Sequence, residues 1–542
     1  IMGTKQYDSA TDLLTFSRAS GGTALSKISY GNELVINGTF DSDLSGWTTA
    51  GTGSMSIVNN QLVATKGSTG WNNTAVYAIP TVAGGVYTVS VDLVGASGQA
   101  YAIISPRPGY YTPELVRVAD NDPVGDTYTN TFVAVSNTSY LHLLPPYNAG
   151  HTSTWDNISV KEVLFGQADG TLQVFNHGNN VPRIEYDATG AVKGLLIEEA
   201  RTNRILTSEV APTSYFGGLT KSVDNSVVSP AGGNNVEKFT LSNANDYHYV
   251  GNHHDICTGT GTSTYSIFAK GSGHNLIRLR MSNMSGSPSC DFDLSTGQKQ
   301  VTSSSDSSVT GAIESIGNGW WRCAMTYTAV KSNPYASVFL IDAMDAPIQT
   351  FQGDGTSSVY VWGSQYESGS FPTSYIPTTG APATRASDIA EIPTSAFGYN
   401  NDKGSLVIDV LTPVADQFMG LVIFNTSNYH HSRSLWKSNY ALNGAGDYFK
   451  AQAHDTVAAQ TTNQALTQQT QAGYTKLGLS YGDSERAVRD GGTVVSGDSR
   501  SPTPTRLHLG GRDNGFQSQC WIKSIQYYPR QLTDTQLQEL TT

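Results

Sequence analysis

The stretch VWGSQYESGSFPTSYIPTTGAPATRASD, residues 361–388, decides how the chain divides. It opens with the alternation of a strand and then leaves regular structure through Gly369, Pro372, Pro377 and Pro382. Proline fixes φ and has no N–H to give to a sheet, so three prolines within eleven residues predict an extended strap on a domain surface. We expect this strap to join two β-domains.

Length, composition and charge narrow the class of protein. The 542 residues exceed what one hydrophobic core usually supports and indicate three or four domains. Only 14% of residues are charged, and 55 glycines and 28 tyrosines are typical of turn-rich β structure. The net charge of −12 argues against nucleic acid or an anionic membrane as partner, because those surfaces bind clustered Lys and Arg. No apolar run is long enough to cross a bilayer, so we expect a soluble protein without membrane insertion.

The four cysteines, Cys257, Cys290, Cys323 and Cys520, are too scattered for a disulfide framework or a CxxC metal site. Cys290 and Cys323 could face each other on neighbouring strands, but buried free thiols are the favoured interpretation. This usage fits a chain that assembles in a reducing cytoplasm.

Short alternating segments, bounded by Gly, Asn, Pro or Asp, predict an antiparallel sandwich over residues 31–165. They are VYTVSVDLVG (86–95), YAIISP (101–106), TYTNTFVAV (127–135) and YLHLLPP (140–146). Residues 206–370 repeat the pattern, since STYSIFAKGSG (263–273) parallels the first segment and VYVWGSQYE (359–367) takes the place of a closing strand. In GNGWWRCAMTYTAV (317–330), Trp320, Arg322, Ala324 and Thr326 should face away from Trp321, Cys323, Met325 and Tyr327.

Residues 401–542 predict a third sandwich, and 371–400 are the proline-rich linker. The final TDTQLQEL predicts a short helix capped by Thr533 or Asp534, with Gln536 in its first turn. The fold class is therefore all-β, with tandem jelly-roll sandwiches followed by a concanavalin-like sandwich.

Three resemblances support this division. The VWGxQxE strand, the SFPTSYIPT strap and TRASD resemble a segment that recurs in tail and other virion proteins of tailed bacteriophages. The ends of the 31–165 segment, NGTFDSDLSGW and TWDNISVKEV, are similar to jelly-roll carbohydrate-binding modules of bacterial glycanases. The strand pattern ending in LHLGG and IKSIQYYPR is similar to a concanavalin-like or laminin-G-like sandwich.

The phage resemblance also concerns the N-terminal residues. In those proteins a segment like TFSRAS runs almost directly into one like NVPRIEYD…GLLIEEARTN, which here covers 180–203. The resemblance implies that residues 1–30 pair or pack against a connecting unit at 166–205, and that 31–165 is an inserted domain whose two ends lie close together. Residues 1–30 would otherwise serve for attachment.

A structural calcium ion is implied by the carbohydrate-binding-module resemblance. In that family calcium often sits where the first and last strands meet, which would place Asp156 beside backbone oxygens near Asn37 and Phe40. One carboxylate is little for an ion that takes six to eight oxygens. Asp156 either caps a turn or ligates calcium, and no other cofactor is expected.

No catalytic constellation has convincing spacing. The pairs His253–His254 and His430–His431 cannot chelate one ion from a regular strand, because adjacent side chains point to opposite faces. A glycoside hydrolase needs two carboxylates about 5 to 10 Å apart across a sugar. Glu198 and Glu199 are adjacent, and Asp409, Asp483, Glu485 and Asp490 fall singly, so we expect these acids to be solvated or to cap turns. We therefore predict a protein that is not an enzyme.

Aromatic residues in loops beside small polar groups are the candidates for sugar binding, because a sugar ring presents apolar C–H faces flanked by hydroxyls. Each candidate is alternatively a core or interface aromatic, and Trp47, Trp155 and Trp362 are expected in cores. The candidates are Trp71, Tyr110, Tyr111, Tyr247, Tyr249, Tyr429, Trp436, Tyr440 and Tyr448.

We therefore expect a phage virion surface protein, assembled in the host cytoplasm, in which a receptor-binding tail protein adheres to host-surface glycan without cleaving it. Weak sites favour a homo-oligomer, with a trimer preferred, because linked sites raise avidity. Other virion proteins would anchor it. The alternatives are a capsid decoration or head fibre protein with the same domains, and a glycan-degrading hydrolase or lyase with binding modules.

Overall fold

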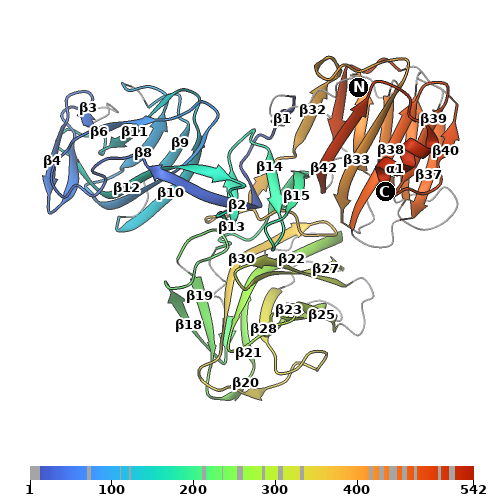
Figure 1. The fold of residues 1–542 in the computed structure, drawn as a ribbon. Coiled ribbons are helices and arrows are strands. Elements are labelled where there is room, and N and C mark those ends of the chain that lie inside the picture. The colour runs from blue at the N-terminus through green and yellow to red at the C-terminus, as the bar shows by residue number, and fades with distance from the viewer. Residues whose placement is uncertain are drawn as a thin grey trace. The chain divides into compact units, whose positions relative to one another are not determined.

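A computed structural model gives the fold (Figure 1). It describes residues 13–542 except 70–74, 110, 121–123, 210–214, 235, 253–260, 283–286, 303–308, 330–334, 414–418, 427–431, 439–447, 455–459, 469–472, 499–501 and 512–518. The chain forms two compact units: the smaller unit is Lys27–Thr171, and the larger unit combines Ile1–Ser26 with Leu172–Thr542. Within the part that the structure describes, no helix has the length and apolar character to cross a membrane.

The smaller unit is a sandwich of two antiparallel sheets. The first has the order β10 (Asp126–Val133), β7 (Val86–Ala96), β12 (Thr152–Phe165) and β2 (Gly22–Glu33), and β12 also pairs with the hairpin of β4 (Ser54–Val58) and β5 (Gln61–Thr65). The second has the order β3 (Trp47–Thr49), β6 (Ala75–Pro80), β11 (Thr138–Leu144), β8 (Tyr101–Ser105) and β9 (Val116–Asp120). Alternate residues of both sheets, such as Val89 and Leu141, fill one core with Trp47 and Trp155, as the sequence predicts.

The larger unit contains a second sandwich of two antiparallel sheets. One has the order β18 (Leu219–Asp224), β19 (Val236–Leu241), β30 (Ser358–Ser368), β22 (Gly261–Ser272), β27 (Trp320–Ala329) and β26 (Thr310–Gly317). The other has the order β17 (Tyr215–Gly217), β21 (His248–Asn252), β28 (Tyr335–Leu340), β23 (Leu276–Ser282), β24 (Ser289–Asp293) and β25 (Gln298–Val301). Two short strands, β20 (Asn245–Asp246) and β29 (Phe351–Gln352), pair with each other as a separate antiparallel sheet.

The predicted alternation in β27 is confirmed. Cys323, Met325 and Tyr327 are buried in the core between the two sheets, while Trp320 is buried on the opposite face with Phe268 and Trp362. The free thiols of Cys290, Cys323 and Cys520 are also confirmed as buried. Cys257 lies outside the described residues.

The third sandwich draws strands from both ends of the larger unit. Its first sheet has the order β1 (Thr15–Ser17), β32 (Ile389–Pro393), β41 (Arg506–Leu509), β34 (Met419–Asn425), β35 (Ser432–Ser438), β36 (Tyr448–His454) and β37 (Gln460–Gln468). The second has the order β14 (Arg183–Tyr186), β15 (Val192–Ile197), β42 (Cys520–Tyr528), β33 (Gly404–Thr412), β38 (Gly473–Tyr481), β39 (Glu485–Arg489) and β40 (Val495–Gly497). The N-terminal strand and the β14–β15 hairpin thus extend sheets formed mainly by residues 389–528.

The remaining elements are short. Strand β13 (Thr171–His177) neighbours β2, and β16 (Arg201–Asn203) pairs with β31 (Ala383–Arg385). The 3-10 turn η2 covers Thr394–Ala396. The helix α1 (Asp534–Thr541) has the capping box formed by Thr533 and Gln536, so the predicted C-terminal helix and cap are confirmed. The all-β fold, with tandem jelly rolls and a concanavalin-like sandwich, is the one that the sequence predicts.

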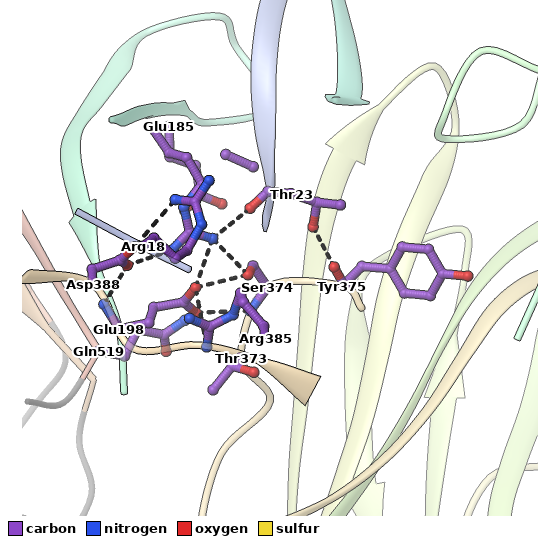
Figure 2. A network of polar contacts seen from close by, with 12 residues as sticks. Arg18, Thr23, Glu185, Glu198, Thr373, Ser374, Tyr375, Arg385, Asp388 and Gln519 are labelled. Atoms are coloured by element: carbon purple, nitrogen blue, oxygen red, sulfur yellow. Dashed lines mark hydrogen bonds and ion pairs between the residues drawn. The ribbon is translucent and has the colours of Figure 1, made fainter. Parts of the chain in front are cut away.

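A buried network of charged side chains joins the N-terminal segment, the β14–β15 hairpin and the end of the strap (Figure 2). Asp388 lies at its centre: one carboxylate oxygen is 3.2 Å from Arg18 Nη1 and the other is 2.5 Å from Arg183 Nη2. All three side chains are fully buried. Backbone carbonyls of His177 and Gly178 accept further hydrogen bonds from Arg18.

Glu198 is the second carboxylate of this network. Its Oε2 lies 2.9 Å from Arg183 Nη1 and 3.5 Å from Arg385 Nη2, and it accepts hydrogen bonds from the backbone and hydroxyl of Ser374 in the strap (Figure 2). Gln519 donates a hydrogen bond of 3.0 Å to Oε1. Burial alone would raise the pKa of Glu198, but the two guanidinium groups and Ser374 outweigh it and lower this pKa to about 2.

The prediction that these acids are solvated or cap turns is therefore wrong for Glu198, which is fully buried as an ion-pair partner. The same correction applies to Glu485, which is buried 2.9 Å from Arg433 Nε. Sequence alone does not reveal such partners, because Arg385 and Arg433 come from distant segments and the approach of Arg183 depends on the register of the β14–β15 hairpin.

The strap is extended, as predicted, but its backbone and side chains are largely buried. Thr373 donates hydrogen bonds from its backbone and hydroxyl to Glu367, and the backbone N–H of Ile376 donates to Gln365. Tyr375 packs its ring against Trp362 at a centroid distance of 4.7 Å. The strap therefore folds back over β30, because that strand offers carboxylate and amide acceptors for backbone groups that no sheet partner satisfies.

Candidate glycan-binding groove

A groove of about 820 Å³ lies on the outer face of the β17–β25 sheet in the second sandwich. Core residues such as Val250, Val338 and Leu279 point to the interior side of this sheet. The alternate positions of the same strands therefore point outwards, and they line the groove. The sheet thus presents a fixed row of side chains rather than a mobile loop.

The floor of the groove is a row of residues that face each other across neighbouring strands. Tyr249 of β21 is opposite Phe339 of β28, which is opposite Arg278 of β23. The rings of Tyr249 and Phe339 are stacked, with centroids 5.2 Å apart and an interplanar angle of 23°. This pair of nearly parallel rings on adjacent strands, called the platform below, gives the groove an apolar floor in which Phe339 is 9% exposed and Tyr249 is half-buried.

Charge is added to this platform by Arg280, two positions along β23. Its guanidinium carbon lies 5.8 Å from the centroid of Phe339, and among the described residues it forms no ion pair. Burial, together with the charge of the neighbouring Arg278, lowers the pKa of Arg280. A cation in this position is available to hydroxyl or carboxylate oxygens of a ligand.

The rim of the groove is held by a buried ion pair. Arg278 contacts Asp291 through two guanidinium nitrogens, one of them at 2.7 Å, and donates a further hydrogen bond of 2.7 Å to the carbonyl of Ala346. The backbone N–H of Asp345 donates to the same carboxylate at 2.8 Å. This pair therefore fixes the segment 345–348 that lines one side of the groove.

Two of the predicted sugar-binding residues line this groove. Tyr247 is 43% exposed at the rim, and Tyr249 is half-buried in the platform. Tyr111 is half-buried in the smaller unit. Trp436 is 8% exposed, with its indole N–H donating to Ser434, so its ring faces are covered. The remaining candidates lie outside the described residues: Trp71, Tyr110, Tyr429, Tyr440 and the side chain of Tyr448.

Phe339, Arg278 and Arg280 were not predicted from the sequence. The segment LIRLRMS (276–282) carried a signal, because an alternating Arg-Leu-Arg on a strand places two cations on one face. No sequence signal marked Phe339, because its position opposite Tyr249 depends on the register between β21 and β28, which only the fold shows.

The metal predictions fall in two groups. Among the described residues, no group of three or more His, Cys, Asp or Glu could hold a metal ion, and both histidine pairs lie outside them. Asn37 and Phe40 both have positive φ, and the carbonyl between them, from Gly38, accepts a hydrogen bond from the Ile158 N–H. Asp156 accepts a hydrogen bond from the backbone of Asn157. This geometry satisfies the turn without an ion, so calcium stays a prediction and no later step depends on it.

No family model and no curated protein matches this chain. Among solved structures, the CBM22-1–CBM22-2 tandem domain of Xyn10C from Paenibacillus barcinonensis is similar, with 11% identity and a TM-score of 0.21 over 62% of this chain and 98% of that chain. The LG1–3 region of the laminin α2 chain is similar with 8% identity and a TM-score of 0.18, over 86% of this chain and 97% of that one. Scores this low carry no argument about function, so the proposal below depends on the groove.

Proposed function

We propose that the chain is a glycan-binding adhesion protein whose second sandwich holds a sugar in the groove beside Tyr249. The observation that carries this proposal is the Tyr249–Phe339 platform beside Arg280. A pyranose ring packs an apolar face on such a platform, while its hydroxyls need donors and acceptors at the edge. Arg280 supplies donors, and the hydroxyls of Ser289 and Thr302, which lie 2.9 Å apart in the lining, can each form a further hydrogen bond.

The size and openness of the site support a glycan rather than a small cofactor. A volume of 820 Å³ is toward the upper end of the range of about 300 to 1,000 Å³ that is usual for small-molecule sites. The exposed ring of Tyr247 at the rim extends the platform toward solvent. Such a site suits an internal segment of a polysaccharide, which enters and leaves the groove as a chain.

The motif resemblance extends the proposal to location. The strap and the TFSRAS segment resemble phage virion proteins, so we place the protein on the surface of a bacteriophage particle, as a receptor-binding tail protein that holds host-surface glycan without cleaving it. A single open groove binds weakly, and a homo-oligomer, a trimer by preference, would raise avidity. Immunogold labelling of intact particles tests this location, because a host protein would leave the particles unlabelled.

Affinity electrophoresis tests binding. The full-length wild type and the variant Tyr249→Ala are run side by side through gels that contain bacterial surface polysaccharides and through gels that do not. We expect at least one polysaccharide to retard the wild type, and the variant to lose most of that retardation. Equal retardation of both proteins would mean that the sugar binds outside the groove. Thermal unfolding of the variant, unchanged within a few degrees, shows that the loss is not misfolding.

A further inference from the structure

A second cavity lies elsewhere in the larger unit. It has a volume of about 530 Å³ and is bounded by strands β26 and β27, the start of the strap at Phe371 and Pro372, and the third sandwich at Leu411 and Trp521. Glu185 and Lys193 of the β14–β15 hairpin and Lys299 of β25 also line it, so six separate parts of the sequence form its walls. Its chemistry differs from that of the groove, because charged side chains lie between apolar ones.

Arg322 is the decisive residue of this cavity. It lies on β27 between Phe268 of β22 and Glu314 of β26, and its guanidinium carbon is 5.4 Å from the centroid of the Phe268 ring. Nη2 donates a hydrogen bond of 3.2 Å to Ser266. Nε is buried and has no hydrogen-bond partner among the described residues. A guanidinium with a free buried donor is costly to hold without an acceptor.

The lack of a carboxylate partner sets Arg322 apart from other buried arginines. Arg18, Arg183, Arg278 and Arg433 each lie within ion-pair distance of a buried Asp or Glu. Within the described part of the chain, Arg322 forms no such pair, and burial lowers its pKa. A positive charge therefore borders the cavity, and the charges of Glu367 and Glu314 act on it, but among the described residues no carboxylate lies within ion-pair distance of it.

The acids near this cavity are already engaged. Glu314 lies 3.0 Å from Lys193 Nζ, and that ammonium also sits 4.2 Å from the centroid of the Trp521 ring. Glu185 accepts a hydrogen bond of 2.5 Å from Trp521 Nε1. Glu367 accepts hydrogen bonds from Gln365 and Thr373. Glu185 and Glu314 line the cavity, and the charges of all three acids reach Arg322, but these contacts hold the carboxylates on other partners.

We propose that this cavity is a second binding site, which takes a carboxylate-bearing sugar of the uronate class with its carboxylate against Arg322. The planar fork of guanidinium matches two carboxylate oxygens. Phe371, Pro372 and Trp521 add apolar atoms to the wall, where Phe371 is 6% and Trp521 8% exposed, and an inorganic anion would not use these contacts. The site is separate from the Tyr249 groove, so either can exist without the other.

Saturation-transfer NMR on the full chain tests this site with two matched probes, glucuronic acid and its uncharged methyl ester. We expect the wild type to bind glucuronate at least tenfold more tightly than the ester. Arg322→Gln should lose that preference, while Tyr249→Ala should keep it. Equal binding of acid and ester, or unchanged glucuronate binding by Arg322→Gln, would overturn the proposal. Acetate binding as tightly as glucuronate would overturn the sugar specificity.

A second variant covers the case in which Arg322→Gln does not fold. Ala312 is exposed on β26 and lines the same cavity, so Ala312→Trp fills it without touching the core. We expect Ala312→Trp to abolish glucuronate binding while the thermal unfolding midpoint stays within a few degrees of the wild type. Glucuronate binding that survives in Ala312→Trp would place the ligand elsewhere and overturn the proposal.

Discussion

Arg18 and Asp388 are 370 positions apart in the sequence, and their side chains form a fully buried ion pair of 3.2 Å. The same carboxylate also binds Arg183 through its other oxygen. One aspartate therefore fixes the N-terminal segment, the β14–β15 hairpin and the end of the strap to each other.

The variant Asp388→Asn should destabilise the larger unit strongly. It keeps the shape of the side chain but leaves two buried guanidinium groups with one carboxylate fewer, and breaking a buried pair costs about 3 to 5 kcal/mol. Urea unfolding followed by tryptophan fluorescence measures the change in the free energy of unfolding. Asp402→Asn, at an exposed position, is the matched control and should change it by less than about 0.5 kcal/mol. Similar values for both variants would refute the role of Asp388.

Stability should depend on pH through His177. Burial, with the charges of Arg183 and Arg18, lowers the pKa of His177 to about 3, against about 6.5 in an unfolded chain. As the pH falls, the unfolded state binds this proton first. The contribution is therefore complete above pH about 6.5 and is lost progressively toward pH 3, at up to about 1.4 kcal/mol per pH unit.

His177→Gln isolates this contribution, because glutamine can still bond to the Ser26 hydroxyl that lies 2.9 Å from Nε2 and does not titrate. Urea unfolding between pH 6.5 and 5 should show a shallower fall in stability for the variant than for the wild type. Parallel curves would mean that His177 binds its proton over the same pH range in the folded and the unfolded chain.

The three described thiols should resist alkylation in the folded protein. Burial, with the charge of Asp291, raises the pKa of Cys290 to about 12, and burial also raises the pKa values of Cys323 and Cys520. The thiolate is the reactive form. Iodoacetamide followed by peptide mass spectrometry should therefore find these residues unmodified until denaturant is added. Rapid labelling of Cys323 without denaturant would contradict its place in the core.

The rim residue Tyr247 should contribute less to glycan affinity than the platform. Its removal in Tyr247→Ala exposes the end of the groove and should weaken binding by about 1 kcal/mol, or roughly fivefold. Tyr147→Ala is a close control, because the two tyrosines are 43% and 45% exposed but Tyr147 belongs to the smaller unit. Isothermal titration with a polysaccharide that retards the wild type in gels compares the affinities of the two variants. Equal losses of affinity would show that the effect is not local to the groove.

Local patterns predicted the strands and the final helix because their causes are local. Alternation in VYTVSVDLVG buries every second residue of β7, and Thr533 with Gln536 caps α1 within one turn. Strand partners across hundreds of residues have no local cause. The pairing of Phe16 with Ala390, and of Leu196 with Trp521, depends on which sheet edges remain open after the rest has folded.

The candidate sites show the same limit. Tyr247 and Tyr249 could be selected from sequence because aromatic residues in a polar segment are visible there. The partner ring Phe339 and the site of Arg322 could not, because both depend on strand register, which sets Phe339 opposite Tyr249 and Arg322 opposite Glu314. Trp436 looked equivalent to the tyrosines in sequence, yet β35 turns its ring inward.

Size-exclusion chromatography with light scattering tests the central claim most directly, that the chain holds a glycan in the groove without cutting it. The full chain is incubated with a polysaccharide that retards it in gels, beside Tyr249→Ala. Wild-type protein should co-elute with polymer of unchanged mass, and the variant should elute alone. A fall in polymer mass with wild-type protein, or co-elution of the variant to the same extent, would contradict it.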